Sequence, residues 1–154
     1  MMKVQGYDIV AKEVPNQISL SIFIGGCPYH CEGCHSPWLW QDEGTPIHDI
    51  LPVLLERYGK SATCIIFMGG DQYKDQLARS INYIRNYNPS LKVCLYTGGE
   101  IEDMKDILPL LDYIKVGKYN KELGGLESPT TNQRFYVLNN GKIVEEINFY
   151  EVKK

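Results

Sequence analysis

Three cysteines lie close together in the stretch IGGCPYHCEGCHSPWLW, which covers residues 24–40. Cys27, Cys31 and Cys34 have the spacing C-x3-C-x2-C, and the sequence contains no second group of cysteines further along. Thiolate sulfur is a soft ligand that suits zinc and iron–sulfur clusters. The spacing therefore indicates a metal centre held by one short loop.

The number of thiols favours a cluster over zinc. A structural zinc site has four protein ligands, commonly as two separated pairs, and His30 or His35 would be needed to complete a Cys₃His set here. A four-iron cluster bound by three cysteines instead leaves one iron without a protein ligand. An open metal position is what a substrate can occupy in a catalytic site. We therefore expect the triplet to hold a four-iron cluster, with zinc as the alternative.

The two remaining cysteines have different surroundings. Cys64 in ATCIIFMGG and Cys94 in LKVCLYTGG each lie within an apolar run that resembles a strand. Free cysteines of this kind usually behave as small buried hydrophobic residues. The total of five cysteines also argues against a secreted disulfide framework, which usually has an even number.

Three short apolar segments each end in a pair of glycines. QISLSIFI is followed by Gly25-Gly26, CIIFM by Gly69-Gly70, and KVCLYT by Gly98-Gly99. Their β-branched and aromatic residues are typical of buried strands. Glycine lets the backbone approach a ligand closely, so we expect these strand ends to form a binding site.

Segments with a helical pattern separate these strands. They cover residues 45–59, 72–89 and 100–112. For the first we predict Thr45 as the N-cap, Pro46 as the first helical residue and a stop at Gly59, with a kink or a late start at Pro52. Strands that alternate with helices predict a mostly parallel sheet, whose strands all end at one edge.

The sequence thus predicts an α/β fold in a single domain over residues 1–154. A closed eight-unit barrel takes about 250 residues, so this chain can build only a partial, open (βα) barrel. Asn140-Gly141 in RFYVLNNGKIVEEINFY predicts a C-terminal β-hairpin, and a turn at Pro15-Asn16 predicts an antiparallel edge strand near the N-terminus.

The C-x3-C-x2-C motif directly after a glycine-ended strand resembles that of the radical S-adenosylmethionine (SAM) enzymes. The resemblance implies that Cys27, Cys31 and Cys34 hold a [4Fe-4S] cluster and act in catalysis. It also implies that SAM chelates the fourth iron through its amino and carboxylate groups. The open metal position would then belong to the cosubstrate.

A second motif of that family follows the next strand. MGGD at residues 68–71 resembles the Gly-Gly-acidic element that receives the amino group of SAM, which assigns cofactor binding to Gly69, Gly70 and Asp71. Thr97 and Gly98 follow the third strand at the same expected edge. We expect them to contact the ribose or the carboxylate of SAM.

Within the radical SAM family, the chain resembles the activating components of anaerobic (class III) ribonucleoside-triphosphate reductases. The motif GCPYHCEGCHSP, the YTGG strand end and residues 111–136 carry this resemblance. One departure lies at residues 116–118, Val-Gly-Lys, where many members have an acidic residue before the glycine. The sequence assigns no role to this loop, nor to His30, His35, Trp38 and Trp40.

The resemblance implies a specific reaction. A flavodoxin-like donor would supply one electron, reductive cleavage of SAM would yield a 5′-deoxyadenosyl radical, and that radical would create a glycyl radical on the large reductase subunit. The chain would be an oxidoreductase of the same type as the activating enzyme of formate C-acetyltransferase. Two alternatives stay open: a different radical SAM enzyme, such as another activase or a 7-carboxy-7-deazaguanine synthase, and a non-catalytic iron–sulfur or zinc module.

Composition excludes some other roles. The net charge of −3 provides no basic excess for binding nucleic acid. The apolar run ISLSIFI is far shorter than the roughly 20 residues of a membrane span. The first ten residues lack the features of a signal peptide. We therefore expect a cytoplasmic protein that contacts neither nucleic acid nor membrane.

Overall fold

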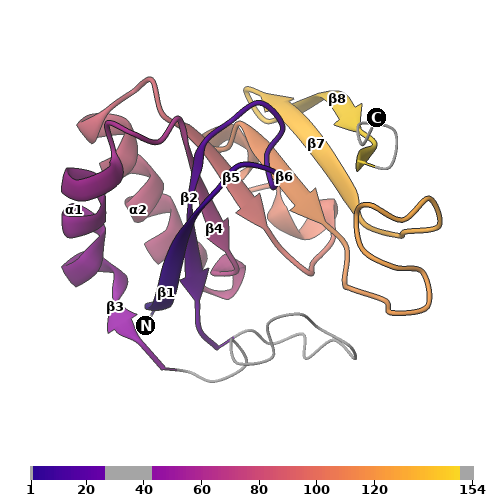
Figure 1. The fold of residues 1–154 in the computed structure, drawn as a ribbon, viewed down its shortest axis with the longest axis horizontal. Coiled ribbons are helices and arrows are strands. Elements are labelled where there is room, and N and C mark those ends of the chain that lie inside the picture. The colour runs from indigo at the N-terminus through magenta and orange to yellow at the C-terminus, as the bar shows by residue number, and fades with distance from the viewer. Residues whose placement is uncertain (1, 27–42, 150–154) are drawn as a thin grey trace.

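The computed structural model describes residues 2–26 and 43–149. An eight-stranded sheet runs through them in the order β3-β1-β2-β4-β5-β6-β7-β8 (Figure 1). The strands are β1 (Lys3–Val10), β2 (Ser19–Ile24), β3 (Thr45–Pro46), β4 (Cys64–Met68), β5 (Lys92–Tyr96), β6 (Tyr113–Val116), β7 (Arg134–Asn139) and β8 (Lys142–Ile147). The helices are α1 (Ile47–Tyr58) and α2 (Lys74–Tyr87), with short 3₁₀ helices at Asp71–Tyr73, Ile101–Met104 and Leu108–Leu110.

The four central strands, β2, β4, β5 and β6, are parallel. Their carboxyl ends therefore lie along one edge of the sheet, where the arrowheads of β2 and β4 point in Figure 1. The strands expected before the three glycine pairs are those that form β2, β4 and β5. The sheet is mixed, and its description as a partial barrel of the radical SAM type stays a prediction.

Antiparallel strands flank the parallel centre on both sides. β1 pairs with β2 after a turn in which Asn16 has a φ of 66°. At the other side, β7 and β8 form the hairpin expected at Asn140-Gly141, and both turn residues have positive φ, 53° and 82°. A pair of positive φ angles matches the right-handed twist of the two strands, which is why Asn-Gly is a favoured hairpin turn.

The start of the first helix differs from the sequence prediction. Thr45 is not its N-cap, because Thr45 and Pro46 pair with β1 as the short strand β3, and the helix begins at Ile47. The backbone N–H of Ile47 donates to the carbonyl of Met2 at 3.0 Å, which ties the helix start to the N-terminus. The helix ends at Gly59 as predicted.

The segment between β5 and β6 forms two short 3₁₀ helices instead of one longer helix. Its apolar residues at 101, 104 and 107 recur every third position, a spacing that fits three residues per turn as well as 3.6. Pro109 lacks a backbone donor and sits in the second 3₁₀ helix. Periodicity alone therefore could not distinguish the two helix types.

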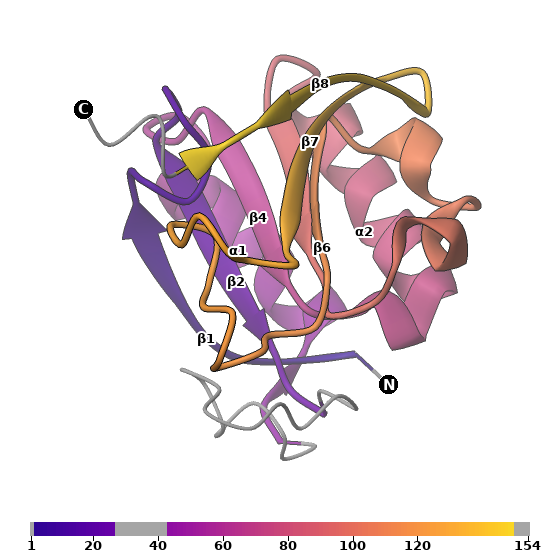
Figure 2. The same ribbon diagram turned by 90° about the vertical axis from the view of Figure 1, so that its right-hand side faces the viewer.

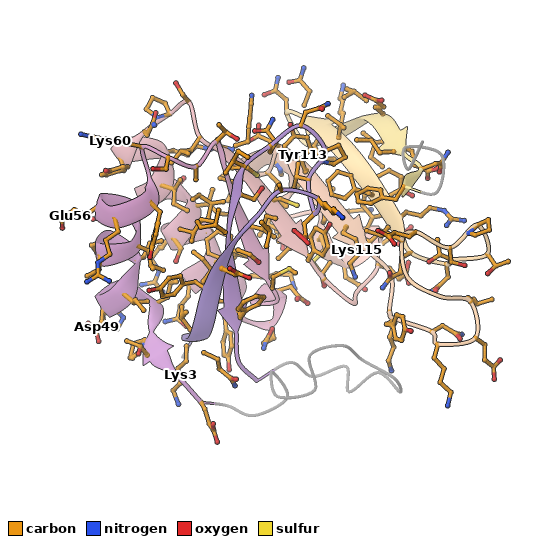
Figure 3. The ribbon with its side chains drawn as sticks, in the orientation of Figure 1. Lys3, Asp49, Glu56, Lys60, Tyr113 and Lys115 are labelled. Carbon is orange, nitrogen blue, oxygen red and sulfur yellow. The ribbon has the colours of Figure 1, made fainter. Side chains whose placement is uncertain are left out.

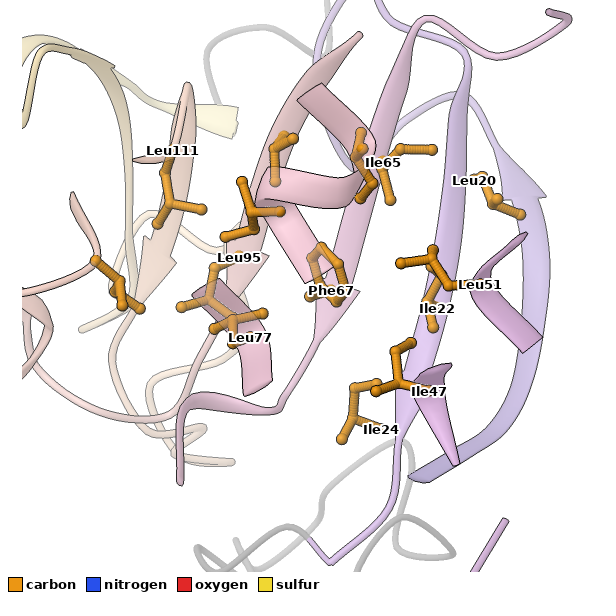
Figure 4. Close-up of a cluster of buried hydrophobic side chains, with 14 of the residues drawn as sticks. Leu20, Ile22, Ile24, Ile47, Leu51, Ile65, Phe67, Leu77, Leu95 and Leu111 are labelled. Atoms are coloured by element: carbon orange, nitrogen blue, oxygen red, sulfur yellow. The ribbon is translucent and has the colours of Figure 1, made fainter. Parts of the chain in front are cut away.

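The main hydrophobic core lies between the sheet and the two helices. Leu20, Ile22 and Phe67 project from the strands toward Leu51 of α1 and Leu77 of α2, and all five are buried (Figure 4). Burying one such side chain stabilises the fold by about 1.5–3 kcal/mol. The opposite face of the sheet, called the inner face below, carries a second apolar cluster around Cys64, Cys94 and Phe135, together with the buried polar residues Ser21 and Lys115.

Candidate functional site

The loops that follow the parallel strands are tied to one another along the edge of the sheet. The Gly69 N–H donates to the carbonyl of Tyr96 at 3.0 Å, and the Thr97 N–H donates to the carbonyl of Lys115 at 2.9 Å. The Gly117 N–H donates to the carbonyl of Gly99 at 2.9 Å. The loops after β4, β5 and β6 therefore form a continuous rim with a fixed backbone.

The backbone angles at the two positions after β4 require glycine. Gly69 has a φ of 93° and Gly70 a φ of 99°, in a region that residues with a Cβ rarely adopt. A Cβ on Gly70 would lie 3.1 Å from the Met2 sulfur, and one on Gly69 would lie 3.5 Å from the Ile24 carbonyl oxygen. These glycines therefore let the loop pack tightly against the end of β2.

Asp71 and Gln72 connect this loop to the neighbouring strand. Asp71 begins the 3₁₀ helix that Gly70 caps, and its side chain is buried, with 3% exposed. The Gln72 side-chain amide donates to the carbonyl of Gly26 at 2.8 Å. The Gly-Gly-Asp motif thus lies beside the carboxyl end of β2, which is the point where the chain enters the cysteine segment.

Thr97 and Gly98 lie on the same rim, as the sequence predicts. Thr97 is 2% exposed, and its hydroxyl oxygen accepts a hydrogen bond from the Gly99 N–H at 3.0 Å. The side chain therefore shapes its own turn. Gly98 is partly exposed. Their expected contacts with SAM stay a prediction.

The cysteine triplet itself lies outside the described residues. This holds for Cys27, Cys31 and Cys34, and for the neighbouring residues 30, 35, 38 and 40. The described parts of the chain contain no group of three His, Cys, Asp or Glu side chains able to hold a metal ion. The metal prediction therefore continues to depend on the spacing of those three cysteines.

Cys64 and Cys94 are the buried residues that the sequence predicts. Both are 0% exposed on the inner face, where they pack with Val14, Ile66 and Phe135. Burial raises the pKa of the Cys64 thiol to about 12 and that of the Cys94 thiol well above its ordinary value. Neutral buried thiols are poor metal ligands, because metals bind the thiolate form.

Lys115 is a residue of the rim that the sequence analysis did not identify. It lies on β6, and it is 8% exposed. Its ammonium donates to the Gly117 carbonyl at 3.2 Å and lies 5.7 Å from the centre of the Tyr96 ring. Figure 3 shows it on β6 near Tyr113. The alternation of Tyr113 and Lys115 in YIKVG, which places both on one face of a strand, was the signal available.

The connection from β6 to β7 supports the rim from the other side. The side-chain amide of Gln133 also donates to the Gly117 carbonyl, at 3.3 Å, and that of Asn132 donates to the Lys118 carbonyl at 3.0 Å. Arg134 donates to the carbonyl of Thr131 at 2.7 Å. These polar residues therefore cap the start of β7 and hold the loop after β6.

Tyr96 and Ser21 also lie on the inner face, and their hydroxyl groups have different environments. The Tyr96 hydroxyl donates to the backbone carbonyl of Glu13, and burial raises the pKa of Tyr96 well above its ordinary value. The Ser21 hydroxyl is 1% exposed and has no hydrogen-bond partner among the described residues.

Comparisons with known proteins agree with an iron–sulfur site. Residues 17–136 match the family model described as a 4Fe-4S single cluster domain. The anaerobic ribonucleoside-triphosphate reductase-activating protein of Enterobacteria phage T4 is 28% identical over 111 residues, which cover 66% of this chain and 71% of that protein. This similarity confirms the resemblance to such activating components. No solved structure matches.

Two further findings complete the comparison. Among the described helices, none combines the length and the apolar character needed to cross a bilayer. The family match spans the cysteine triplet, the Gly-Gly-Asp motif and the whole rim described above, and it covers well over half of the sequence. The chain therefore belongs to the family of 4Fe-4S single cluster domains.

Proposed function

We propose that this protein is a radical SAM activase that generates a glycyl radical on an anaerobic ribonucleoside-triphosphate reductase. One observation carries the proposal: Gly69, Gly70 and the buried Asp71 lie beside the end of β2, from which the chain continues into the cysteine triplet. A cluster site and an ammonium-binding site are thereby expected at the same end of the sheet. That is the arrangement that an amino-acid cosubstrate at the open iron requires.

The residues present fit both groups. Three closely spaced thiols supply three of the four ligands that a [4Fe-4S] cluster needs. The left-handed glycines after β4 let the loop pack closely against the end of β2, beside the point where the chain enters the cysteine segment. Asp71 supplies a negative charge for the ammonium of SAM. When bound, the cluster supplies the electron that cleaves the cosubstrate.

SAM accepts one electron, its bond between sulfur and the 5′ carbon breaks, and methionine and a 5′-deoxyadenosyl radical form. The radical then takes a hydrogen atom from the α-carbon of a glycine on the partner. The products are 5′-deoxyadenosine and a glycyl radical. The protein supplies orientation and exclusion of water, while the cofactors carry the bond-breaking chemistry.

We assign the large subunit of an anaerobic ribonucleoside-triphosphate reductase as the partner, and a flavodoxin-like protein as the electron donor. The relative in phage T4 is named for activating such a reductase. The described βα units are too few to enclose a small substrate, as the open order of the sheet indicates. A glycine-bearing loop of the partner would then cover the rim and shield the radical.

The metal assignment is tested by anaerobic reconstitution. The wild-type protein should bind about four irons and four sulfides per chain, as a single cubane cluster requires. Alanine at Cys27, Cys31 or Cys34 should abolish cluster binding, whereas Cys64→Ala and Cys94→Ala should retain it. Stoichiometric zinc with no iron absorbance would instead support a zinc module.

The reaction is tested with the partner present. Reduced enzyme, SAM and the reductase should produce the doublet electron paramagnetic resonance signal of a glycyl radical. Deuterium placed on the α-carbon of the target glycine should appear in the released 5′-deoxyadenosine. If the deuterium stays on the reductase while an added small molecule is consumed, the protein is a different radical SAM enzyme. If SAM is not cleaved at all, the iron–sulfur module is non-catalytic.

A further inference from the structure

A groove runs between α1 and α2 on the outer surface of the protein (Figure 1). Its floor is apolar, and the exposed ring of Tyr83 lines it from α2. This part has a volume of about 350 Å³, and a more open hollow of about 460 Å³ continues it along the first turns of α2. The two parts share Gln76 and Arg79, and together we call them the helix groove. Apolar surface bordered by polar side chains is typical of a binding site.

Both ends of the segment that contains the cysteine triplet meet the helix groove. Gln72 lines the groove, and its side-chain amide donates at 2.8 Å to the carbonyl of Gly26, the last described residue before that segment. After the segment, the chain returns through the short strand β3 and continues directly into Ile47, which lines the groove from α1. A protein docked in the helix groove would therefore lie beside both points at which the cysteine segment joins the fold.

The helix groove lies on the side of the sheet that the proposed protein substrate does not need. Its floor residues Ile47 and Leu51 belong to the core between the sheet and the helices. The glycine-bearing loop of the reductase is expected at the rim and the inner face, on the other side. A donor that approached from the helices would leave the rim covered while the electron arrives. The helix groove therefore suits the electron donor better than the protein substrate.

The charge of the helix groove fits an acidic partner. Lys74 and Arg79 line it, and Asp75 is the one acidic side chain among the described residues of its lining. The Lys74 ammonium donates to the Asp71 backbone carbonyl at 3.2 Å, and Arg79 donates to that of Asp75 at 3.4 Å. A backbone carbonyl has no net charge, so these bonds orient both cations without neutralising them. The groove is thus positive on a chain whose net charge is −3.

We propose that the helix groove docks an acidic, flavin-bearing electron-transfer protein, which Lys74 and Arg79 attract. This inference rests on the proposed function and adds the surface through which the electron enters. One electron passes from the reduced flavin of the donor to the cluster expected in the cysteine segment, so the flavin is oxidised by one electron and the cluster is reduced by one. The Tyr83 ring and the apolar floor suit the aromatic edge of a flavin.

The test measures how fast a donor reduces the cluster in anaerobically reconstituted protein. Stopped-flow absorbance follows the reaction with reduced flavodoxin, an acidic flavin protein, and with dithionite, a small reductant that needs no docking surface. Arg79→Glu reverses a charge in the groove. Lys60→Glu reverses an exposed charge beyond the other end of α1 and is the matched control (Figure 3). Iron and sulfide contents show that each variant carries the cluster.

At about 0.01 M salt, where charges act over about 30 Å, Arg79→Glu should lower the second-order rate constant with flavodoxin by about tenfold. The difference should shrink at high salt, because screening removes the attraction between exposed charges. Lys74→Glu should act in the same direction. Its new carboxylate at the start of α2 favours the helix, so this variant tests the inference if Arg79→Glu fails to fold. Lys60→Glu should react like the wild type, and dithionite should reduce all four proteins alike.

Three outcomes would overturn the inference. If both groove variants keep the wild-type rate with flavodoxin, the donor docks elsewhere. If they slow the reduction by dithionite to the same extent, the substitutions disturb the cluster site itself. If they weaken binding of the large reductase and leave the flavodoxin rate unchanged, the groove receives the protein substrate. A wild-type protein whose cluster is reduced by flavodoxin but that never cleaves SAM would refute the proposed function and leave the docking surface intact.

Discussion

At the scale of single residues, Gly70 shows how a backbone angle links stability and binding. Its φ of 99° lies in a region that branched residues rarely adopt, and a Cβ there would also press on the Met2 sulfur at 3.1 Å. Gly70→Val should lower the free energy of unfolding by about 1–3 kcal/mol. It should also block SAM binding while the cluster assembles normally.

Urea denaturation and calorimetry with SAM measure these two effects. Gly6→Ala is the matched control, because a Cβ there would make an ordinary contact of 3.7 Å with Phe23 and the residue has no left-handed angle. This variant should bind SAM like the wild type. Unchanged SAM affinity in Gly70→Val would mean that the motif is only a turn.

The buried thiol of Cys64 predicts a pH dependence of stability. Burial raises its pKa from 9.0 to about 12, so the folded state keeps the thiol neutral over a range in which the unfolded chain ionises it. The contribution of the neutral Cys64 thiol to the free energy of unfolding is therefore complete below pH 9, and it is lost as the pH rises toward 12. Unfolding free energies of the wild type and Cys64→Ala, measured between pH 7 and pH 11, should test this.

Near neutral pH, Cys64→Ala should be less stable than the wild type by about 1 kcal/mol, the cost of removing one buried heavy atom. The difference should shrink above pH 9, because the variant has no thiol to ionise. A difference that stays constant with pH would show that the thiol is not shielded from solvent.

At the scale of elements, Arg85 joins α2 to the strands that carry the rim. Its guanidinium donates to the carbonyls of Leu91 and Leu110, both at 2.8 Å, and to the Asp112 carboxylate at 2.9 Å. The same carboxylate accepts the Val93 N–H at 2.9 Å. An arginine on a surface helix is most simply expected to be solvated, but this network makes Arg85 a structural residue that fixes the starts of β5 and β6.

Arg85→Met should therefore destabilise the protein by roughly 1–2 kcal/mol, since three carbonyl or carboxylate acceptors lose their donor and the pair is only partly exposed. Urea denaturation provides the measurement. Arg79→Met, on the exposed side of the same helix, should change stability by less than about 0.5 kcal/mol. Equal effects from both arginines would contradict the role of the network.

At the scale of the whole molecule, the connection between β6 and β7 borders the rim. It spans residues 117–133, and Figure 2 shows it passing in front of the sheet. Its own contacts hold it, including bonds from the Thr130 hydroxyl to the Leu123 carbonyl at 2.8 Å and from the Thr131 hydroxyl to the Gly124 carbonyl at 3.0 Å. Long connections of this kind are uncommon and usually functional.

An open rim predicts that SAM cleavage depends on the partner. The amounts of methionine and 5′-deoxyadenosine formed by the reduced enzyme should match the glycyl radical formed when the reductase is present. Without the reductase, or with a reductase whose target glycine is replaced by alanine, cleavage should be slow and unproductive. The measurement is product quantification beside spin counting. Equal, fast cleavage in all three conditions would show that no partner is needed to complete the site.

The sequence by itself determined the strand ends and the chemistry expected there. The segment CIIFM and its glycine pair predicted β4 and the loop after it, because a short apolar run and a glycine are local signals that need no knowledge of the rest of the chain. The same holds for the hairpin at Asn140-Gly141 and for the burial of Cys64 and Cys94.

Only the tertiary structure decided which distant residues meet at the rim. Lys115 is 44 positions from Asp71 in the numbering, and the two come to one edge because β4, β5 and β6 pair in parallel and in register. Thr45 and Pro46 likewise become a strand because β1 lies beside them. Pairing between strands far apart in the chain depends on the free energy of the whole sheet, and no local pattern in the sequence encodes it.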